Sequence, residues 1–532
     1  MEGLNPAGRA TVGIMYAGHK EYWTQFEGTR EAHVEGARRF REVVEQSPVD
    51  VVMPDLVDTV ELSFEAGRRF EESGIDLLFV YLHSYVASGR WVPGVRHLDV
   101  PVVIVTFQEA LDFDDLDEYV TGTGIRKGSA CQLPEAYSAL LRAGKEAADV
   151  IFGDVSGDPR VQEQIGEWCR VANVLRGYRD CVIGYLGHSY DGMLDMNFDP
   201  TAITRRFGIY VKMLEMCELV EYVESATEAE VEAKIAEMRE VFEFLDDSPD
   251  PVTKPARPED IEWAARCAVG LDRLAEENNL AGLTYYYAGL NNIYERVGSN
   301  LIVGNTLLTR RGLSLAGEAD MKTCIAMKTT SALGAGGSFA EFNMADFEKD
   351  QVMVGHDGPH DLRITDRQPV IRGLGLYHGK RGHGLSVEFS IRKGDMTMVS
   401  LGSDAEGAFK FVVAEGQSVP GPLPQIGNTI TRGYFGRDIA SFLRDWAMRG
   451  VPHHMSLCVG HVGSVMKKLG RALQMDVELL RQSGGLSLPR SGTRRPSSQP
   501  RRPDNRARSR SPGSSGARRA PCSTGSAEWC ST

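Results

Sequence analysis

The sequence predicts an α/β protein in which two doubly wound, Rossmann-like α/β domains are followed by a β-rich C-terminal domain. The first third of the chain alternates short apolar segments with amphipathic ones. Two of the apolar segments, residues 75–81 (IDLLFVY) and 100–106 (VPVVIVT), are almost continuously hydrophobic. Such segments are typical of parallel strands that helices cover on both faces. After about residue 336, alternating polar and apolar positions indicate antiparallel sheet.

The N-terminal α/β domain is expected to span residues 1–178. Its predicted strands are residues 11–16, 50–53, 75–81, 100–106 and 150–152, and its predicted helices are about 26–46, 62–73, 134–148 and 160–174. The first strand leads into GIMYAG at residues 13–18 and lacks the GxGxxG of a dinucleotide site. An NAD-dependent oxidoreductase is therefore disfavoured.

A central α/β domain is expected over residues 179–335 and a β-rich domain over 336–480. The central domain has predicted strands at 181–185 and 283–288 and predicted helices at about 228–245 and 258–277. The β-rich domain has predicted strands at 384–391, 396–401 and 409–414 and predicted helices at 437–449 and 461–469. The sequence RKGD at 392–395 predicts a hairpin that joins the first two of these strands.

Residues 481–532 differ in composition from the rest of the chain. They contain eleven Arg, two acids and almost no aliphatic residues, so they are expected to form a disordered tail. Such a tail could be a basic nucleic-acid arm or a solvated extension, but an out-of-frame reading of GC-rich DNA is the preferred interpretation. The remaining body has 48 basic and 71 acidic residues, a charge of about −23. This charge disfavours nucleic acids and anionic membranes as partners and fits a neutral small-molecule substrate.

The cysteines and the N-terminus indicate a cytoplasmic protein. Nine Cys are scattered without a CxxC pair, which is typical of a reduced compartment. The apolar run 12–17 is too short for the core of a signal peptide, and no stretch approaches the roughly 18 apolar residues of a membrane helix.

A candidate metal site emerges from the second half of the chain, where seven of the twelve His lie between residues 356 and 461. Glu318, Glu341, His356 and His454 would supply two carboxylates and two imidazoles. Carboxylates suit Mn²⁺ or Mg²⁺, and imidazoles shift the preference toward Mn²⁺ or Co²⁺. Four protein ligands leave two octahedral positions for the carbonyl and the adjacent hydroxyl of a sugar. A carboxylate on each side could then move a proton between C1 and C2 through an enediol.

Each of these residues also has a purely structural interpretation. Glu318 could cap a helix that begins near residue 320, and Glu341 could be a surface acid. Either imidazole could be a satisfied structural histidine. Spacing alone leaves these alternatives open, because no short-range pattern such as HExxH is present.

Three longer stretches carry a resemblance to a known family. They are residues 316–322 (AGEADMK), 336–356 (GGSFAEFNMADFEKDQVMVGH) and 452–454 (PHH), with weaker echoes at 81–91, 107–108 and 205–208. In order and spacing, the sequence resembles the L-arabinose isomerase family, within the L-arabinose/L-fucose isomerase superfamily, along nearly all of the body.

The resemblance implies a cytoplasmic, metal-dependent aldose–ketose isomerase of the L-arabinose to L-ribulose type, active in arabinose catabolism. It implies that Glu318 and Glu341 are catalytic and that Glu318, Glu341, His356 and His454 bind Mn²⁺, or else Co²⁺ or Mg²⁺. It also implies sugar contacts at His19, Met193 and Asp320. The expected assembly is a homo-hexamer or homotrimer with the site at a subunit boundary.

The sequence departs from the family where that family contacts its sugar. Ala17-Gly18-His19 replaces a serine-glutamine-histidine turn, and Cys131 stands where a neighbouring subunit donates a histidine. Phe342-Asn343 replaces an aspartate-tyrosine pair. The reaction type is therefore better indicated than the sugar. A hexose, a deoxysugar or a sugar acid stays open as substrate, as does an inactive sugar-binding protein of the same fold.

Overall fold

The structure is a computed structural model, and it describes residues 8–109, 119–245, 250, 252–287, 292–375 and 382–480. The predicted tail at 481–532 lies outside the described residues. The described residues belong to one compact unit. Among the described helices, none is both long and apolar enough to cross a membrane.

The N-terminal domain contains a five-stranded parallel sheet of order β2-β1-β3-β4-β5. Its strands are β1 (Ala10–Ala17), β2 (Val49–Val52), β3 (Leu77–Leu82), β4 (Val102–Phe107) and β5 (Asp149–Gly153). The helices around it are α1 (Tyr22–Gln25), α2 (Thr29–Val44), α3 (Val60–Glu72), α4 (Val92–Val95), α5 (Thr121–Lys127), α6 (Gln132–Arg142) and α7 (Pro159–Tyr178). This strand order, with chain reversal at β1, is that of a doubly wound fold.

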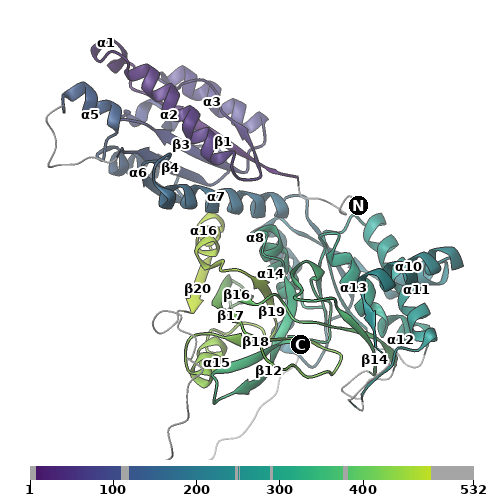
Figure 1. The fold of residues 1–532 in the computed structure, drawn as a ribbon. Helices are drawn as coiled ribbons and strands as arrows, with labels where there is room; N and C mark the ends of the chain where they lie inside the picture. The colour runs from purple at the N-terminus through teal and green to yellow at the C-terminus, as the bar shows by residue number, and fades with distance from the viewer. Residues whose placement is uncertain are drawn as a thin grey trace, which may run out of the picture. The chain divides into compact units, whose positions relative to one another are not determined.

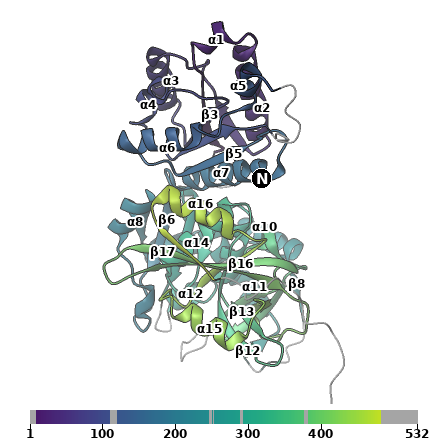
Figure 2. The same cartoon turned by 90° about the vertical axis from the view of Figure 1, so that its left-hand side faces the viewer.

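Both faces of this sheet are buried, as its continuous apolar strands predict. Leu77, Phe79 and Tyr81 of β3 pack in one apolar cluster with α2 and α7. The alternate residues Leu78 and Val80 pack in a second cluster with α3, α4 and α6. The two helical layers are visible on either side of the strands in Figure 2.

The central domain is built on a second parallel sheet, of order β11-β10-β6-β7. Its strands are β6 (Val182–Gly187), β7 (Tyr210–Leu214), β10 (Gly282–Tyr286) and β11 (Ser314–Ala316). Its helices are α8 (Pro200–Phe207), α9 (Met216–Glu224), α10 (Glu228–Val241), α11 (Pro258–Glu277), α12 (Ile293–Gly298), α13 (Leu301–Thr309) and α14 (Met321–Ala332). Short strands β8 (Glu243–Phe244) and β9 (Thr253–Lys254) join β14 (Val370–Gly375) and β15 (His383–Glu388) in a small sheet.

The β-rich region is a closed barrel. Strands follow the order β16-β19-β12-β13-β18-β17, and pairing of β16 with β17 closes the ring. These strands are β12 (Ser338–Asp346), β13 (Gln351–His356), β16 (Gly394–Ser403), β17 (Phe409–Ser418), β18 (Thr429–Tyr434) and β19 (Met455–Val459). Strand β20 (Asp476–Leu480) adds to β17, and α15 (Ile439–Ala447) and α16 (Gly463–Leu473) accompany the barrel (Figure 1). The two parallel sheets and this barrel confirm the predicted fold class. The domain boundaries stay predictions.

One predicted pairing is wrong. The segment 384–391 does not form a hairpin with 396–401. Strand β15 pairs with β14 in the small sheet, whereas β16 pairs with β17 and β19. An alternating pattern specifies which face of a strand is buried but not which strand is its neighbour, so the RKGD turn suggested the wrong partner.

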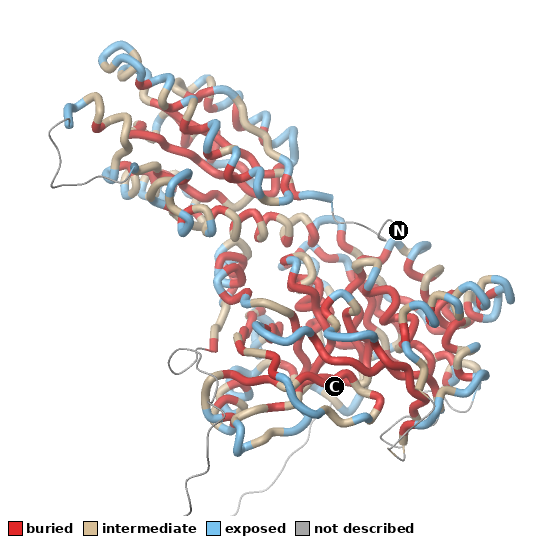
Figure 3. The backbone as a smooth tube through the Cα atoms, viewed as in Figure 1, coloured by how far each residue is buried: buried red, intermediate tan, exposed pale blue. Residues whose placement is uncertain are grey.

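Helix α14 lies between the central sheet and the barrel. It packs against β10 and β11 of the central sheet and against β16 and β19 of the barrel. Residues Met321–Thr330 are all buried, so this part of the helix has no side exposed to solvent. Figure 3 shows buried backbone along this helix as well as along the strands. Because α14 follows Glu318 directly, its packing fixes that residue against the barrel.

Candidate metal and active site

Two strands, one turn and the segment before a third strand carry the four predicted donors. Glu318 lies in the turn between β11 and α14, Glu341 in β12, and His356 at the end of β13. Strands β12 and β13 are antiparallel neighbours with Glu341 opposite Gly355, so adjacent strands place Glu341 and His356 together. His454 immediately precedes β19, which pairs with the other side of β12.

The backbone at Glu318 is strained. Glu318 and the next residue, Ala319, have φ angles of 55° and 60°. This left-handed conformation costs on the order of 1 kcal/mol or more for a residue with a side chain, and it persists only where the surroundings enforce it. The turn aims the Glu318 carboxylate toward the histidines of the barrel.

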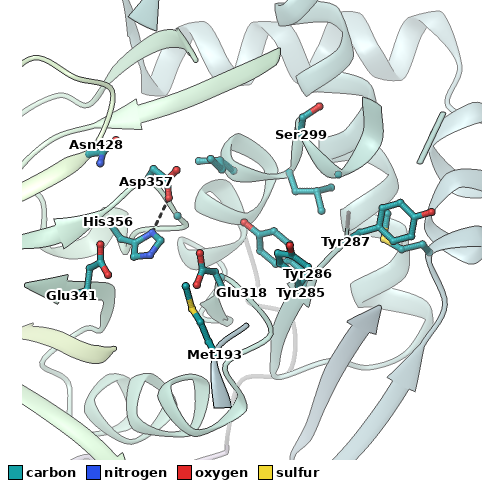
Figure 4. A pocket seen from close by; sticks show the side chains of 16 residues that line it. Met193, Tyr285, Tyr286, Tyr287, Ser299, Glu318, Glu341, His356, Asp357 and Asn428 are labelled. Carbon is teal, nitrogen blue, oxygen red and sulfur yellow. Dashed lines mark ion pairs between the residues drawn. The ribbon is translucent and has the colours of Figure 1, made fainter. Parts of the chain in front are cut away.

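The donors converge. Glu341, His356 and His454 each offer a ligand atom within 4.8 Å of the other two, and Glu318, His453 and His454 do the same. Figure 4 shows Glu318, Glu341 and His356 directed into one shared space. The distance from Glu318 Oε2 to His454 Nε2 is 3.7 Å.

His454 is fully buried, and a contact with Asp320 fixes the orientation of its ring. Its Nδ1 lies 3.1 Å from Oδ2 of Asp320, which also caps α14 by accepting from Thr323 N at 3.0 Å. The other nitrogen of His454, Nε2, is buried without a hydrogen-bond partner, and so is Glu318 Oε2. Burial lowers the pKa of His454 and keeps the ring neutral, as a metal ligand must be. A cation between these two atoms would satisfy both, so the residues fit a bound metal ion.

The electrostatics around His356 also favour positive charge. His356 Nδ1 lies 2.8 Å from the carboxylate of Asp357. Burial alone would lower the pKa of His356, but Asp357, Glu341 and Glu318 together raise it to about 9. Three carboxylates around one buried ring therefore stabilise a cation at this position.

The donors open onto a cavity of about 200 Å³. Tyr285, Tyr286 and Tyr287 form an aromatic wall that leads away from the donors (Figure 4). The remaining lining residues come from several elements: Met193, Met216, Gly298, Ser299, Leu301, Ile302, Gly317, Gly358 and Asn428, with Asp357 and three of the donors.

Comparisons with known proteins show which proteins the chain is similar to. Residues 197–336 match the model of the L-arabinose isomerase central domain. An L-arabinose isomerase of Arthrobacter sp. is 24% identical over 430 residues, which are 77% of this chain and 80% of that protein. One of Clavibacter sepedonicus is 24% identical over 403 residues (72% and 76%), and one of Escherichia coli is 22% identical over 393 residues (71% and 75%). Over most of its length the chain is similar to L-arabinose isomerases, and its residues 197–336 match their central domain.

The sugar contacts that the L-arabinose isomerase resemblance implied lie in three different settings. Met193 lines the cavity beside Glu318 (Figure 4). Asp320 lies behind His454 and is not among the lining residues. His19 follows β1 in the N-terminal domain, where its ring packs on Tyr22, and it does not line the described cavity of its own chain.

Two other histidines near the donors have protein partners. His360 is buried, with Nε2 2.9 Å from the carbonyl oxygen of His356. His453 Nδ1 lies 2.6 Å from Asp195 Oδ2, and its ring lies against that of His454 with centroids 3.8 Å apart and the ring planes tilted by 42°. These contacts orient both rings beside the donors.

Several lining residues were not predicted from the sequence. Asp357 could have been predicted, because it directly follows the predicted ligand His356. Tyr286 and Asn428 carry no such signal, because they reach the cavity from β10 and from the approach to β18. Only the folded arrangement of sheet and barrel brings them to the donors.

Proposed function

We propose that this chain is a metal-dependent aldose–ketose isomerase of the L-arabinose to L-ribulose type. The observation that carries the proposal is the convergence of two carboxylates and two imidazoles, with buried atoms of Glu318 and His454 that lack hydrogen-bond partners. The similar proteins named above are L-arabinose isomerases, which supports the same reaction.

Glu318, Glu341, His356 and His454 would hold Mn²⁺, or else Co²⁺ or Mg²⁺. The ion would supply Lewis-acid polarisation of the sugar carbonyl. The chain's own residues would move the protons: Glu318 or Glu341 would take a proton from C2 and deliver it to C1, and the hydroxyl proton of O2 would pass to O1, with an enediol between the two sugars. Asp320 holds His454 in place, and Asp357 holds His356, so that each ring has one fixed orientation.

The lining of the cavity favours a neutral sugar over a sugar acid. Among the described lining residues, Glu318, Glu341 and Asp357 are carboxylates and none is Lys or Arg. A substrate carboxylate would therefore meet three like charges and no Lys or Arg to pair with. A pentose, a hexose or a deoxysugar therefore fits better. An inactive sugar-binding protein is disfavoured, because binding a sugar does not require four converging metal donors.

We further propose a cytoplasmic homo-hexamer or homotrimer with the site at a subunit boundary. The location of His19 supports a shared site, since this residue does not line the described cavity of its own chain.

The test is a panel of aldoses, L-arabinose and D-galactose first, with Mn²⁺ added and ketose formation measured. We expect ketose from at least one neutral aldose, little without metal, and none from sugar acids. In deuterated water, proton transfer through an enediol should place deuterium in the product. A direct hydride shift between the carbons would keep the label out and overturn the acid–base roles of Glu318 and Glu341. Absence of ketose from every pentose, hexose and deoxysugar would overturn the proposed activity.

A further inference from the structure

The loop between β6 and α8, residues 188–199, forms one wall of the cavity. It contributes Met193, whose side chain points toward Glu318 and His356 in Figure 4. The next residue, Leu194, is 78% exposed, so the loop runs along the surface at this point. Met196 is fully buried and anchors the loop by apolar packing. Apolar packing of one side chain does not fix the direction of its neighbours, so the polar contacts of the loop determine where Met193 points.

Lys322 makes the first of these polar contacts from α14. Its Nζ donates to the carbonyl oxygen of Asp195 at 2.6 Å and to that of Asn197 at 3.0 Å. Lys322 is only 4% exposed. If the loop moved away, a buried ammonium would lose both acceptors, which is costly in a site that water hardly reaches. The two hydrogen bonds therefore hold the loop against α14.

Asp195 makes the second contact, to the histidine doublet. Its Oδ2 accepts from the backbone N–H of His453 at 3.0 Å and lies 2.6 Å from Nδ1 of the same residue. The loop is thus bridged to α14 through its backbone and to the segment before β19 through a side chain. These are the two elements that flank the donors Glu318 and His454.

We infer that Lys322 and Asp195 are positioning residues that clamp the 188–199 loop, and with it Met193, against the substrate cavity. Neither residue lines the cavity, so both act through Met193 and the loop backbone. Their effect should fall on sugar binding rather than on metal binding, because the donors come from other elements. The role in sugar binding rests on the proposed function.

The first test is Lys322→Met, which keeps a long apolar stem and removes the two hydrogen bonds. Loss of a charged hydrogen bond typically changes an equilibrium by roughly 10- to 100-fold, so we expect KM for the sugar to rise by about that factor. The kcat should stay within about threefold, and the Kd for Mn²⁺ should not change. Met193→Ala should raise KM as well. The KM of the double variant should be no higher than that of the single variant with the higher KM, since both changes remove the contact of Met193 with the sugar.

Lys328→Met is the matched control. Lys328 lies on the same helix and is also buried (7% exposed), and among the described contacts it makes no hydrogen bond to the loop. Its replacement removes a buried ammonium from α14 but should leave KM unchanged. If Lys322→Met fails to fold, Asp195→Asn tests the other half of the clamp, because the amide keeps the size of the side chain and removes its charge.

Hydrogen exchange of amides 188–199 provides a readout that does not depend on catalysis. In Lys322→Met these amides should exchange faster, with no change in Lys328→Met. Unchanged exchange would overturn the clamp. A fall in Mn²⁺ affinity together with the rise in KM would also overturn it, since Lys322 would then act through the donors. If no sugar is converted at all, the proposed function fails, whereas the exchange measurement still decides the clamp.

Discussion

At the scale of single residues, Glu318 and Glu341 are each expected to serve as metal ligand and as proton carrier. Replacing either by Gln removes a negative charge from the ion and a proton acceptor from the sugar carbons. Each variant should lose about 10²–10⁴-fold in rate even at saturating Mn²⁺, because restored metal occupancy does not restore the acid–base group. Measuring kcat against Mn²⁺ concentration checks this.

Glu348→Gln is the control for this pair, since Glu348 is exposed in the turn between β12 and β13 and should leave kcat unchanged. Recovery of the full rate in Glu318→Gln or Glu341→Gln at high Mn²⁺ would contradict the catalytic roles and leave only metal binding.

Asp320 should act on the metal through His454. Asn is as good a helix cap as Asp, so Asp320→Asn should keep α14 folded. The neutral amide orients the His454 ring less firmly than the carboxylate does, and loss of such an outer partner typically costs 10–100-fold in metal affinity. Calorimetric titration with Mn²⁺ should show about this loss, with little change in the unfolding temperature.

Asp438→Asn is the matched substitution, because Asp438 caps α15 by accepting from Ser441 N at 2.7 Å. It should leave Mn²⁺ affinity unchanged. An Asp320→Asn variant with wild-type affinity would show that Asp320 matters only as a helix cap.

The residue types of the site could be predicted from the sequence, whereas their surroundings could not. Glu318, Glu341, His356 and His454 stand in longer stretches with a recognisable order, and the structure brings these four residues together. Tyr286 stands in an ordinary apolar strand. Whether such a side chain reaches the site depends on how the sheet meets the barrel, which no local pattern encodes.

At the scale of elements, two buried histidines connect α2 to the end of β3. Their ring centroids lie 4.9 Å apart. His33 is hydrogen-bonded to Ser84 at 2.8 Å, and His83 is hydrogen-bonded to the carbonyl oxygen of Arg126 at 2.9 Å. Burial lowers the pKa of His33 to about 4 and that of His83 to about 3. Both rings are therefore neutral in the folded N-terminal domain at neutral pH.

This lowering fixes the sign of a pH effect. Below about pH 6.5 the unfolded chain binds protons that the folded domain does not, so stability is complete above that pH and is lost as pH falls toward 4. Each histidine should contribute a slope of about 1.4 kcal/mol per pH unit in this window. Urea unfolding of the wild type between pH 7 and pH 4.5 measures the total slope.

His33→Gln should reduce the slope by one histidine's share, whereas His97→Gln, at an exposed position, should not. Equal slopes in the wild type and in His33→Gln would show that His33 is protonated in the folded domain as readily as in the unfolded chain.

The strands of the N-terminal sheet were predictable because each is apolar on both faces. The barrel strands were harder, since their alternation defines a buried face and not a partner. The hairpin wrongly predicted at 384–401 shows this limit, because β15 belongs to the small sheet, where it pairs with β14, and not to the barrel. Helix α14 is a different case: it is buried all round, so it lacks the amphipathic pattern by which helices are recognised.

At the scale of the whole molecule, the site forms only when the barrel packs against the central domain. Glu318 comes from the central domain, and the other three donors come from strands β12 and β13 and the approach to β19. Pairing of β12 with both β13 and β19 aligns those three, and α14 joins them to Glu318. Metal binding should therefore report on the assembly of both parts of the chain.

The proposed site between subunits leads to the last prediction. His19 follows β1 and does not line the described cavity of its own chain, so in the proposed assembly its contact with substrate would come from a neighbouring copy. His19→Ala and Glu341→Gln should each lower activity when expressed alone. When the two variants are co-expressed and purified as mixed oligomers, random assembly should restore about a quarter of the sites, those that combine an intact Glu341 with an intact neighbouring His19. Co-expression of His97→Ala with Glu341→Gln provides the baseline, since exposed His97 should leave its own subunits fully active. Mixed oligomers no more active than the average of the two separate variants would contradict the shared site, as would a monomeric mass by light scattering at micromolar concentration.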